Sequence, residues 1–573
     1  MDDFPLGSTR LGFADEKDVD AFVARLEQFE RGEIGADEWR AFRLLNGVYG
    51  QRQDGAMMIR AKVPGGILTP AQFEALAQVA DRWAGGEGHI TTRQNIQLHF
   101  VAMENVEEAL RLLADAGITT REACGNSVRN GTLCPFAGVS PTEPFDATPY
   151  HEALVRHLLR GPFSSSLPRK FKPAVSGCCG TDCTLARIND LGFISKWTDA
   201  GPAFELVAGG GLSTLRRSAL TLEESLPAGE ILEAAEAVVR VFHRIGNRNN
   251  KAKARLKWAI DKIGPDAFRA EYAREREVIR AEGGRPLELP PLPRLPLGSL
   301  PQAAEELPGF ETWRGSNSRP QKQQGFSAVT IRVRLGALSG AQMRALAALS
   351  AHGEGELRLT PDQNIVLRWV PSWRLPQVHR DLVAMGLAEA GAGTIGDVVS
   401  CPGTASCKIA VTASRGLAGL LVDHLEAHPE VAAKARDLHI RISGCPNGCG
   451  QHYIGGVGFQ GGVRKIDGRA VPQYLVYLGG GVASDRAVFG RLVGKVPARY
   501  VPKTLERLLD LYVARGNGAP PEVFFAGVPL DEAKLLLKDL MELDAARAVP
   551  ADFVDIGEQQ AFVEQVTEGE CAA

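Results

Sequence analysis

The stretches that decide the fold are two short turns, Cys401-Pro402-Gly403-Thr404-Ala405-Ser406-Cys407 and Gly444-Cys445-Pro446-Asn447-Gly448-Cys449-Gly450. Glycine and proline let both turns bend tightly, so their thiolates can converge, and nearby backbone N–H groups can donate hydrogen bonds to sulfur. In a chain without signs of secretion, such a quartet indicates a metal centre and not disulfide bonds. The pattern predicts a cubane iron–sulfur cluster whose ligands are Cys401, Cys407, Cys445 and Cys449.

Two alternatives to this cluster remain open from the residues alone. Any one of the four cysteines could be a small apolar residue of the core. A tetrahedral zinc site also uses paired cysteines, but zinc pairs usually have two to four residues between them. Five residues separate Cys401 from Cys407, so the spacing favours the iron–sulfur cluster.

The composition is that of an ordinary globular protein, with 573 residues, 44% hydrophobic and 23% charged. A net charge of −3 argues against broad nucleic-acid binding and gives no membrane-surface signal. The first five residues, Met1 to Pro5, lack the basic and apolar segments of a signal peptide, and no apolar run approaches a bilayer span. We expect a cytoplasmic monomer of about three or four domains that binds neither nucleic acid nor membranes.

An internal repeat spans most of the chain. Six short matches occur in the same order in both halves, at offsets between 267 and 272 residues, which chance does not produce. The matched pairs are Ile59–Val63 with Ile331–Leu335, Leu68–Gln72 with Leu338–Gln342, Gln94–Ile96 with Gln363–Ile365, Ser176–Cys178 with Ser443–Cys445, Gly209–Gly211 with Gly479–Gly481, and Gly246-Asn247 with Gly516-Asn517. A proline-rich segment where the copies meet, 286–308, predicts an extended surface connector.

Both copies predict the same order of strands and helices. Each has an alternating strand pattern, then an amphipathic helix and a second strand, and each closes with a glycine loop and another helix. The expected segments are strands at 57–63 and 329–335, first helices at 71–83 and 341–350, and last helices at 231–244 and 503–515. This order indicates an α+β or α/β pseudo-dimer.

The copies differ in the residues that can bind ligands. Aligned residues are Cys445 with Cys178, Cys449 with Asp182, and Cys401-Pro402 with Cys134-Pro135. The first copy therefore keeps part of the cysteine pattern, and it has Arg93 where the second copy has Asp362. The run from Cys178 to Cys183 could suggest a second metal site. We interpret it as a relic of the duplication, because no other ligand set completes it.

Three motifs carry a resemblance to a known family. They are Thr91-Thr92-Arg93-Gln94-Asn95-Ile96-Gln97-Leu98-His99, Leu167-Pro168-Arg169-Lys170-Phe171-Lys172 and the cysteine quartet. With the repeat, they make the chain resemble the sirohaem-containing sulfite and nitrite reductases from about residue 40 to about residue 530, most closely the ferredoxin-dependent assimilatory sulfite reductases. The resemblance implies an α+β, internally duplicated pseudo-two-fold fold with ferredoxin-like half-domains and two sirohaem/iron–sulfur-type α/β domains.

The resemblance also implies an order of domains along the chain. An N-terminal helical segment (1–45) precedes the first ferredoxin-like half-domain (46–115) and the first copy of the sirohaem-binding domain, which supplies distal cations (116–282). A proline-rich linker (283–315) leads to the second half-domain (316–390), the domain that carries the cysteine ligands (391–550) and a C-terminal tail (551–573).

Site residues follow from the same resemblance. The four cysteines would hold a [4Fe–4S] cluster, and Cys449 would also bridge to the sirohaem iron. Anionic substrate would be bound, and protons donated as oxygen leaves as water, by the cations Arg60, Arg129, Lys170 and Lys172. The eight carboxylates of sirohaem would be held by Arg93, Gln97 and Asn130. Lys170 and Lys172 stand two apart on an expected strand, so both would point to one face.

Other residues carry weaker hypotheses. His99 is favoured as a structural residue over a proton relay. The two glycine triplets could cradle carboxylates through their backbone amides, and a tight strand-end loop is at least as well supported. Tyr49 and Cys124 match a pair that is cross-linked beside the sirohaem in some ferredoxin-dependent relatives, and we carry that cross-link over as a hypothesis.

Lys172 bears on the substrate. The nitrite-specialised branch of the family tends to carry asparagine there, and sulfite, a larger dianion at high pH, suits a second lysine. We expect the six-electron reduction of sulfite to sulfide, with reduction of nitrite to ammonia as the alternative.

The electron donor must be a separate protein, because the chain has no flavin or nicotinamide module. Ferredoxin is expected, with a flavoprotein subunit as the alternative. Arg216-Arg217 could help to dock an acidic donor, although an exposed arginine pair is usually only solvated.

Two other classes of protein remain as alternatives to a reductase. One is a sirohaem-fold monooxygenase of corrin biosynthesis, which Lys170 and Lys172 disfavour. The other is a non-catalytic scaffold that binds zinc.

Overall fold

The chain forms two compact units in the computed structural model, which describes residues 12–178, 182–290, 305–565 and 569–570 and the backbone of two short paired strands, β1 (Phe4–Pro5) and β12 (Arg294–Leu295). Unit 1 comprises Met1–Gly211, Arg217–Ala390 and Glu570–Ala573. Unit 2 comprises Leu212–Arg216 and Gly391–Gly569. Within the described part of the chain, no helix is long and apolar enough to cross a membrane.

Two five-stranded sheets of unit 1 confirm the predicted pair of ferredoxin-like half-domains. The first has the order β15-β5-β6-β3-β2 and the second β13-β14-β17-β16-β4. The strands of the first are β2 (Val48–Gly50), β3 (Ala56–Ala61), β5 (Glu87–Ile90), β6 (Ile96–Ala102) and β15 (Ala337–Ser339). Those of the second are β4 (Ile67–Leu68), β13 (Ser318–Pro320), β14 (Phe326–Ile331), β16 (Leu357–Leu359) and β17 (Ile365–Pro371). Each sheet takes its edge strand, β15 or β4, from the other copy.

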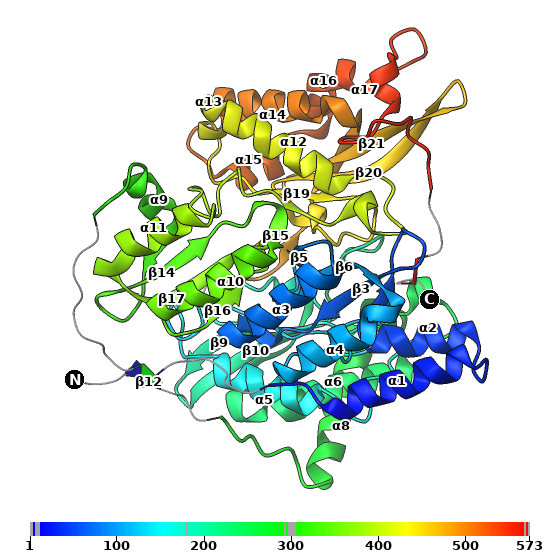
Figure 1. Ribbon diagram of the computed structural model, residues 1–573, viewed down its shortest axis with the longest axis vertical. Coiled ribbons are helices and arrows are strands. Elements are labelled where there is room, and N and C mark those ends of the chain that lie inside the picture. The colour runs from blue at the N-terminus through cyan, green and yellow to red at the C-terminus, as the bar shows by residue number, and fades with distance from the viewer. Residues whose placement is uncertain are drawn as a thin grey trace. The chain divides into compact units, whose positions relative to one another are not determined.

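The first helices of the two copies begin with the same device. In α3 (Pro70–Trp83) the Thr69 side chain caps the helix and Gln72 returns the bond, and in α10 (Gly340–Leu349) Ser339 and Gln342 do the same. Both helices start one residue before the predicted segments. Other helices of this region are α1 (Glu16–Glu30), α2 (Ala36–Leu45), α4 (Val106–Asp115), α9 (Phe310–Asn317) and α11 (Leu375–Ala384). Figure 1 shows α3 and α10 side by side.

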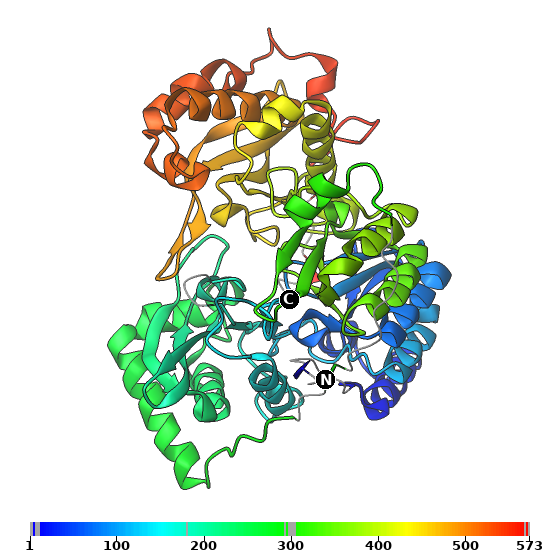
Figure 2. The same cartoon turned by 90° about the vertical axis from the view of Figure 1, so that its left-hand side faces the viewer.

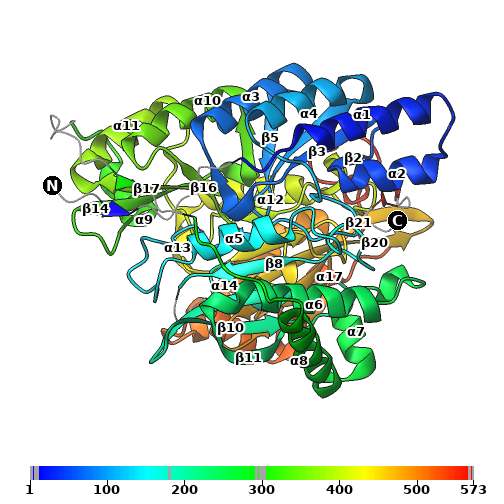
Figure 3. The same ribbon diagram turned by 90° about the horizontal axis from the view of Figure 1, so that it is seen from below.

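A third sheet in unit 1 belongs to the first copy and has the order β7-β8-β9-β10-β11. Its first two pairs are parallel and the other two antiparallel. The strands are β7 (Thr132–Leu133), β8 (Pro173–Ser176), β9 (Leu191–Thr198), β10 (Gly201–Ala208) and β11 (Leu220–Pro227). Figure 3 shows helices of the same copy beside this sheet: α5 (Thr148–Leu158), α6 (Ile231–Ile245), α7 (Leu256–Ile263) and α8 (Pro265–Ala281).

Unit 2 repeats this sheet, which confirms the duplication. Its order is β18-β19-β20-β21-β24, again with two parallel pairs followed by two antiparallel pairs. The strands are β18 (Val399–Ser400), β19 (Ile440–Ser443), β20 (Val457–Ile466), β21 (Arg469–Leu478) and β24 (Arg491–Pro497), with β22 (Gly481–Val482) and β23 (Ala487–Val488) as a separate hairpin. The helices of this unit are α12 (Ser414–Ala427), α13 (Pro429–Ala433), α14 (Val501–Arg515), α15 (Pro521–Gly527), α16 (Leu530–Leu536) and α17 (Lys538–Met541), all within the yellow to red part of the chain in Figure 2.

The expected strand at Lys170 and Lys172 is shorter than the sequence suggested. β8 begins only at Pro173, and Phe171 makes an isolated parallel bridge with Val128. The proline residue cannot donate to a ladder, which limits regular pairing at this point. Phe171 is nevertheless fully buried between two half-buried lysines, so the alternation survives without the strand.

Candidate cofactor and substrate site

The sheet of unit 2 brings the two cysteine turns together. β18 and β19 are parallel, so their carboxyl ends lie at one edge, and Cys401 and Cys445 follow those ends. The Cys401 N–H donates to the Ile442 carbonyl at 3.3 Å. Two glycines are required here: Gly403 has a φ of +63°, and a Cβ on Gly450 would lie 1.8 Å from the Ile442 oxygen.

The spacing and charge of the quartet suit a cluster larger than one ion. The structure describes all four cysteines, and no three of their sulfur atoms lie within 4.8 Å of one another. Burial and then the Cys449 charge raise the pKa of the Cys401 thiol, and burial, Cys449, Cys401 and Cys407 together raise that of Cys445. The thiols therefore influence one another's pKa, although no three of them meet as closely as three ligands of one zinc ion would.

Cys401 also has hydrogen-bond partners that suit a cluster ligand. Its Sγ atom accepts from the Gly444 N–H at 3.3 Å and lies 3.2 Å from the Ser414 hydroxyl. Such bonds to cluster sulfur orient the ligand and tune the potential of the metal.

In unit 1, two of the predicted cations converge on one carbonyl. Arg60 and Arg129 both donate to the Ala123 oxygen, at 3.3 and 3.0 Å. Arg129 also donates twice to the Gly125 carbonyl, at 2.7 and 3.1 Å. Arg60 lies directly opposite Gln97 in the β3–β6 register, so both side chains point to the same face of the sheet.

The two lysines adjoin this pair through the backbone. The Arg129 N–H donates to the Phe171 carbonyl at 2.8 Å, which places Arg129 beside the segment that carries Lys170 and Lys172. The Lys172 N–H donates to the Asp190 carboxylate at 3.0 Å. The structure thus gathers all four predicted distal cations in one region of unit 1.

Arg93 is a clamp within the protein. Its guanidinium donates to the Asn130 and Pro173 carbonyls at 2.5 and 2.7 Å, and to the Thr132 hydroxyl and Asn189 amide oxygen at 3.2 and 3.1 Å. Burial lowers the Arg93 pKa to about 9, with Asp190 opposing and Arg129 and Arg255 reinforcing the effect. The Asn130 side chain donates to the Val63 and Arg93 carbonyls at 2.7 and 3.1 Å. Both residues hold the loops that present the cations, and a role in holding sirohaem stays a prediction.

Sequence reasoning missed a further buried cation, Lys257 on α7. Burial, and then the neighbouring Arg255 charge, lower the Lys257 pKa to about 7, while Asp190 opposes the shift and Lys170 reinforces it. Arg255 donates to the Asp190 carboxylate at 3.0 and 2.6 Å. The signal in the sequence was the alternating basic run from Lys251 to Lys257.

Both glycine triplets form tight loops whose backbone groups pair within the protein. The Gly209 N–H donates to the Asp190 carbonyl at 2.9 Å, and Gly211 pairs with Arg217 through both backbone bonds. The Gly479 and Gly480 N–H groups donate to the Gly456 and Gly455 carbonyls at 2.9 and 3.0 Å. These amides are therefore used by the protein itself.

Arg216 and Arg217, the residues suggested to dock an acidic donor, both contact other residues of the protein. Arg216 lies 4.6 Å from the centre of the Tyr453 ring, and Arg217 forms an ion pair with Asp261. These contacts weaken the hypothesis that the pair docks a donor. His99 lies in β6 with its ring 6.5 Å from that of His89.

The hypothetical cross-link partners have defined positions in unit 1. Tyr49 lies in β2 opposite Met58, and the Cys124 thiol is buried next to Ala123. The cross-link stays a prediction.

The duplicated α+β scaffold, with a cysteine quartet in one copy and a group of cations in the other, suits a redox enzyme that acts on an anionic substrate. The family model described as "Nitrite and sulphite reductase 4Fe-4S domain" matches residues 124–279 and 391–521. That described as "Nitrite/Sulfite reductase ferredoxin-like half domain" matches residues 49–116 and 319–385. The chain therefore belongs to the nitrite and sulphite reductase family, and its cofactors are sirohaem and a [4Fe–4S] cluster.

Individual relatives divide between two activities. The chain is 32% identical over 464 residues to a ferredoxin–nitrite reductase of Synechococcus elongatus, covering 79% of this chain and 86% of that protein. It is 34% identical over 442 residues to a sulfite reductase [ferredoxin] of Mycobacterium tuberculosis, covering 76% of this chain and 75% of that protein. The solved structure of the Mycobacterium tuberculosis NirA protein matches with a TM-score of 0.75 at 29% identity, covering 89% of this chain and 95% of that one.

Proposed function

We propose that this protein reduces sulfite to sulfide with six electrons from ferredoxin. The observation that carries the choice of sulfite is the pair Lys170 and Lys172 on either side of the buried Phe171, adjoining Arg129. Four cations in one region suit a dianion better than the smaller monoanion nitrite. Reduction of nitrite to ammonia is the alternative on the same scaffold.

Each group of residues has a separate task in this proposal. Sirohaem and the cluster supply the electron transfer when bound. Arg60 and Arg129 bind the anionic oxygens of the substrate through guanidinium N–H groups. Lys170 and Lys172 donate protons as the oxygens of sulfite leave as water, so that one sulfite, six electrons and the accompanying protons give one sulfide and three waters.

The cofactors are assigned to residues by the same proposal. Cys401, Cys407, Cys445 and Cys449 would hold the cluster, and Cys449 is the cysteine that the resemblance assigns to the haem as well. Arg93, Gln97 and Asn130 hold the haem carboxylates. Support comes from the thiol chemistry of the quartet and from the buried, cation-rich surroundings of Arg93.

Ferredoxin as donor is supported by the relatives, whose names assign ferredoxin to both activities. The test is product analysis with reduced ferredoxin as the only electron source. The expected result is one sulfide formed for every six ferredoxins oxidised. Oxidation of ferredoxin by nitrite with ammonia as product, and no sulfide from sulfite, would replace the proposal by its alternative.

A further inference from the structure

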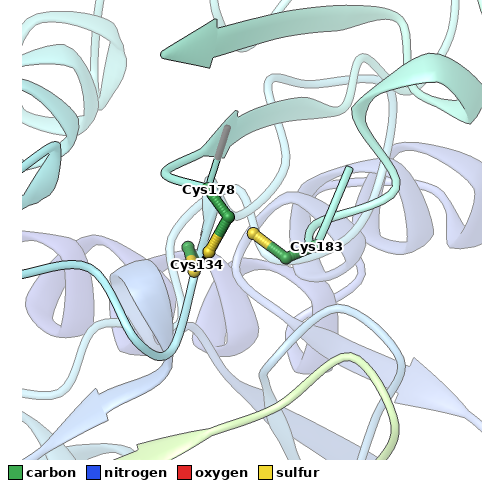
Figure 4. A group of neighbouring side chains, drawn as sticks. All are labelled: Cys134, Cys178 and Cys183. Carbon is green, nitrogen blue, oxygen red and sulfur yellow. Dashed lines mark hydrogen bonds between the residues drawn. The ribbon is translucent and has the colours of Figure 1, made fainter. Parts of the chain in front are cut away.

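Three cysteines of unit 1 form a group that the predicted cluster does not use. The sulfurs of Cys134, Cys178 and Cys183 all lie within 4.8 Å of one another, and those of Cys134 and Cys178 are 3.5 Å apart. Among the described residues, this is the one set of three or more histidine, cysteine or acidic side chains that meets so closely. Figure 4 shows the three sulfurs pointing toward one another, that of Cys134 from the loop after β7 and the other two from the chain that follows β8.

The duplication explains how the three cysteines meet. Cys134 follows β7 and its N–H donates to the Val175 carbonyl at 3.1 Å, just as Cys401 follows β18 in unit 2. Cys178 lies two residues after the end of β8, as Cys445 lies two residues after β19. The relic interpretation rested on the lack of another ligand to complete the run from Cys178 to Cys183, and Cys134 supplies one.

The other two cluster positions of this copy have changed. At the common offset of 267 residues, Cys407 corresponds to Ser140 and Cys449 to Asp182. The Asp182 carboxylate accepts from the Ala186 and Arg187 N–H groups at 2.7 and 2.9 Å, which caps a short helix. Cys183, the residue after Asp182, brings the third thiol of the group.

The size of the group suits a single ion. Tetrahedral zinc, with Zn–S distances of about 2.3 Å, places its sulfurs roughly 3.8 Å apart. The 3.5 Å between Cys134 and Cys178 is close to that value, whereas no three sulfurs of the quartet in unit 2 approach within 4.8 Å. The same distance is far longer than a disulfide bond of about 2.05 Å.

The surroundings hold the group firmly and balance its charge. The loop between Cys134 and Ser140 is fixed from outside, because Gln323 donates to the Gly138 carbonyl and the Lys322 N–H to that of Val139, both at 2.9 Å. Ser140 places its hydroxyl 3.4 Å from the Cys178 sulfur. Arg319 lies close enough to Cys134 and Cys178 to interact electrostatically. Three thiolates with one divalent ion carry one net negative charge, which a single arginine offsets.

We propose that Cys134, Cys178 and Cys183 bind one zinc ion as a structural site of the first copy, with water as the fourth ligand beside Ser140. This site is separate from the cluster of unit 2 and does not depend on which oxyanion the enzyme reduces. Its role is to fasten the loops after β7 and β8, the two parallel strands that Arg129 and the lysines directly precede in the chain.

Metal analysis of the full-length holoenzyme tests the proposal. After growth in medium with zinc, inductively coupled plasma mass spectrometry should find about one zinc per chain in addition to the iron. Cys178→Ser and Cys183→Ser should each lose most of this zinc while their iron content and haem absorption show that they fold. Cys124→Ser is the matched control, because Cys124 is a buried cysteine of the same unit outside the group, and it should retain zinc.

A measurement on the unaltered enzyme covers the case in which the variants do not fold. X-ray absorption at the zinc edge should show three sulfur neighbours at about 2.3 Å and one light atom. Absence of zinc, a shell of oxygen and nitrogen only, or a Cys134–Cys178 disulfide in mass spectrometry of the oxidation-protected protein would each overturn the proposal. Zinc retained in both serine variants would overturn it as well.

Discussion

Replacing Arg368 by methionine removes the cation of a fully buried ion pair. Arg368 donates from Nε and Nη2 to the Glu354 carboxylate at 2.6 and 2.7 Å, and both side chains are 0% exposed. It also donates to the Ala137 carbonyl, in the loop between Cys134 and Ser140. Loss of one partner of such a pair costs about 3–5 kcal/mol, because the other charge remains buried. Arg358 also interacts electrostatically with Glu354 and compensates part of its charge. We therefore expect the free energy of unfolding to fall by about 3 kcal/mol.

Native-state hydrogen exchange measured by mass spectrometry reports this loss locally. A loss of about 3 kcal/mol in stability should speed amide exchange roughly a hundredfold in the peptide that spans β16 and β17, because each 1.4 kcal/mol changes the opening equilibrium about tenfold. Arg344→Met is the matched control: its ion pairs with Glu74 and Asp81 are about 40% exposed, so less than about 1 kcal/mol is expected. The double variant Arg368→Met/Glu354→Met should recover most of the protection. Equal effects of Arg368→Met and Arg344→Met would refute this reasoning.

Three further predictions address the site and its supports. Lys172→Asn should lower kcat/KM for sulfite relative to kcat/KM for nitrite by roughly tenfold or more. An unchanged ratio would show that Lys172 does not select the substrate. Cys445→Ser should remove most iron and acid-labile sulfide from the purified protein, whereas full retention of both would exclude Cys445 as a ligand. Burial raises the pKa of Glu143 to about 7 against the opposing charge of Lys322, so the folded chain holds a proton there that the unfolded chain releases near 4.5. Stability relative to Glu143→Gln should therefore fall as pH rises from about 4.5 to about 7, as followed by thermal unfolding, and a rise would contradict the assigned shift.

Local signals account for the parts of the fold that the sequence predicted well. The 3.6-residue period placed α3 and α10 within one residue of their ends, because this signal lies inside the segments themselves. The repeat then implied two copies of each sheet. Strand exchange was beyond this reasoning: β4 and β15 are two- and three-residue edge strands whose pattern does not distinguish one partner sheet from the other.

Long-range pairing accounts for what was missed at the candidate site. Cys134 and Cys178 lie 44 residues apart, and only the parallel pairing of β7 and β8 brings them together with Cys183. Lys257 joins the cations through the packing of α7, which no motif marks. Arg93 was assigned a haem-binding role from its motif, yet its hydrogen bonds to two backbone carbonyls and the Asn189 side chain show a second task that the motif alone does not reveal.

The central claim is that this cation-rich site serves sulfite. The most direct measurement compares kcat/KM for sulfite and nitrite in the purified holoenzyme, with reduced methyl viologen as a donor that is indifferent to docking. The account predicts the higher specificity constant for sulfite, with sulfide as the product. A higher specificity constant for nitrite, with ammonia as the product, would contradict it.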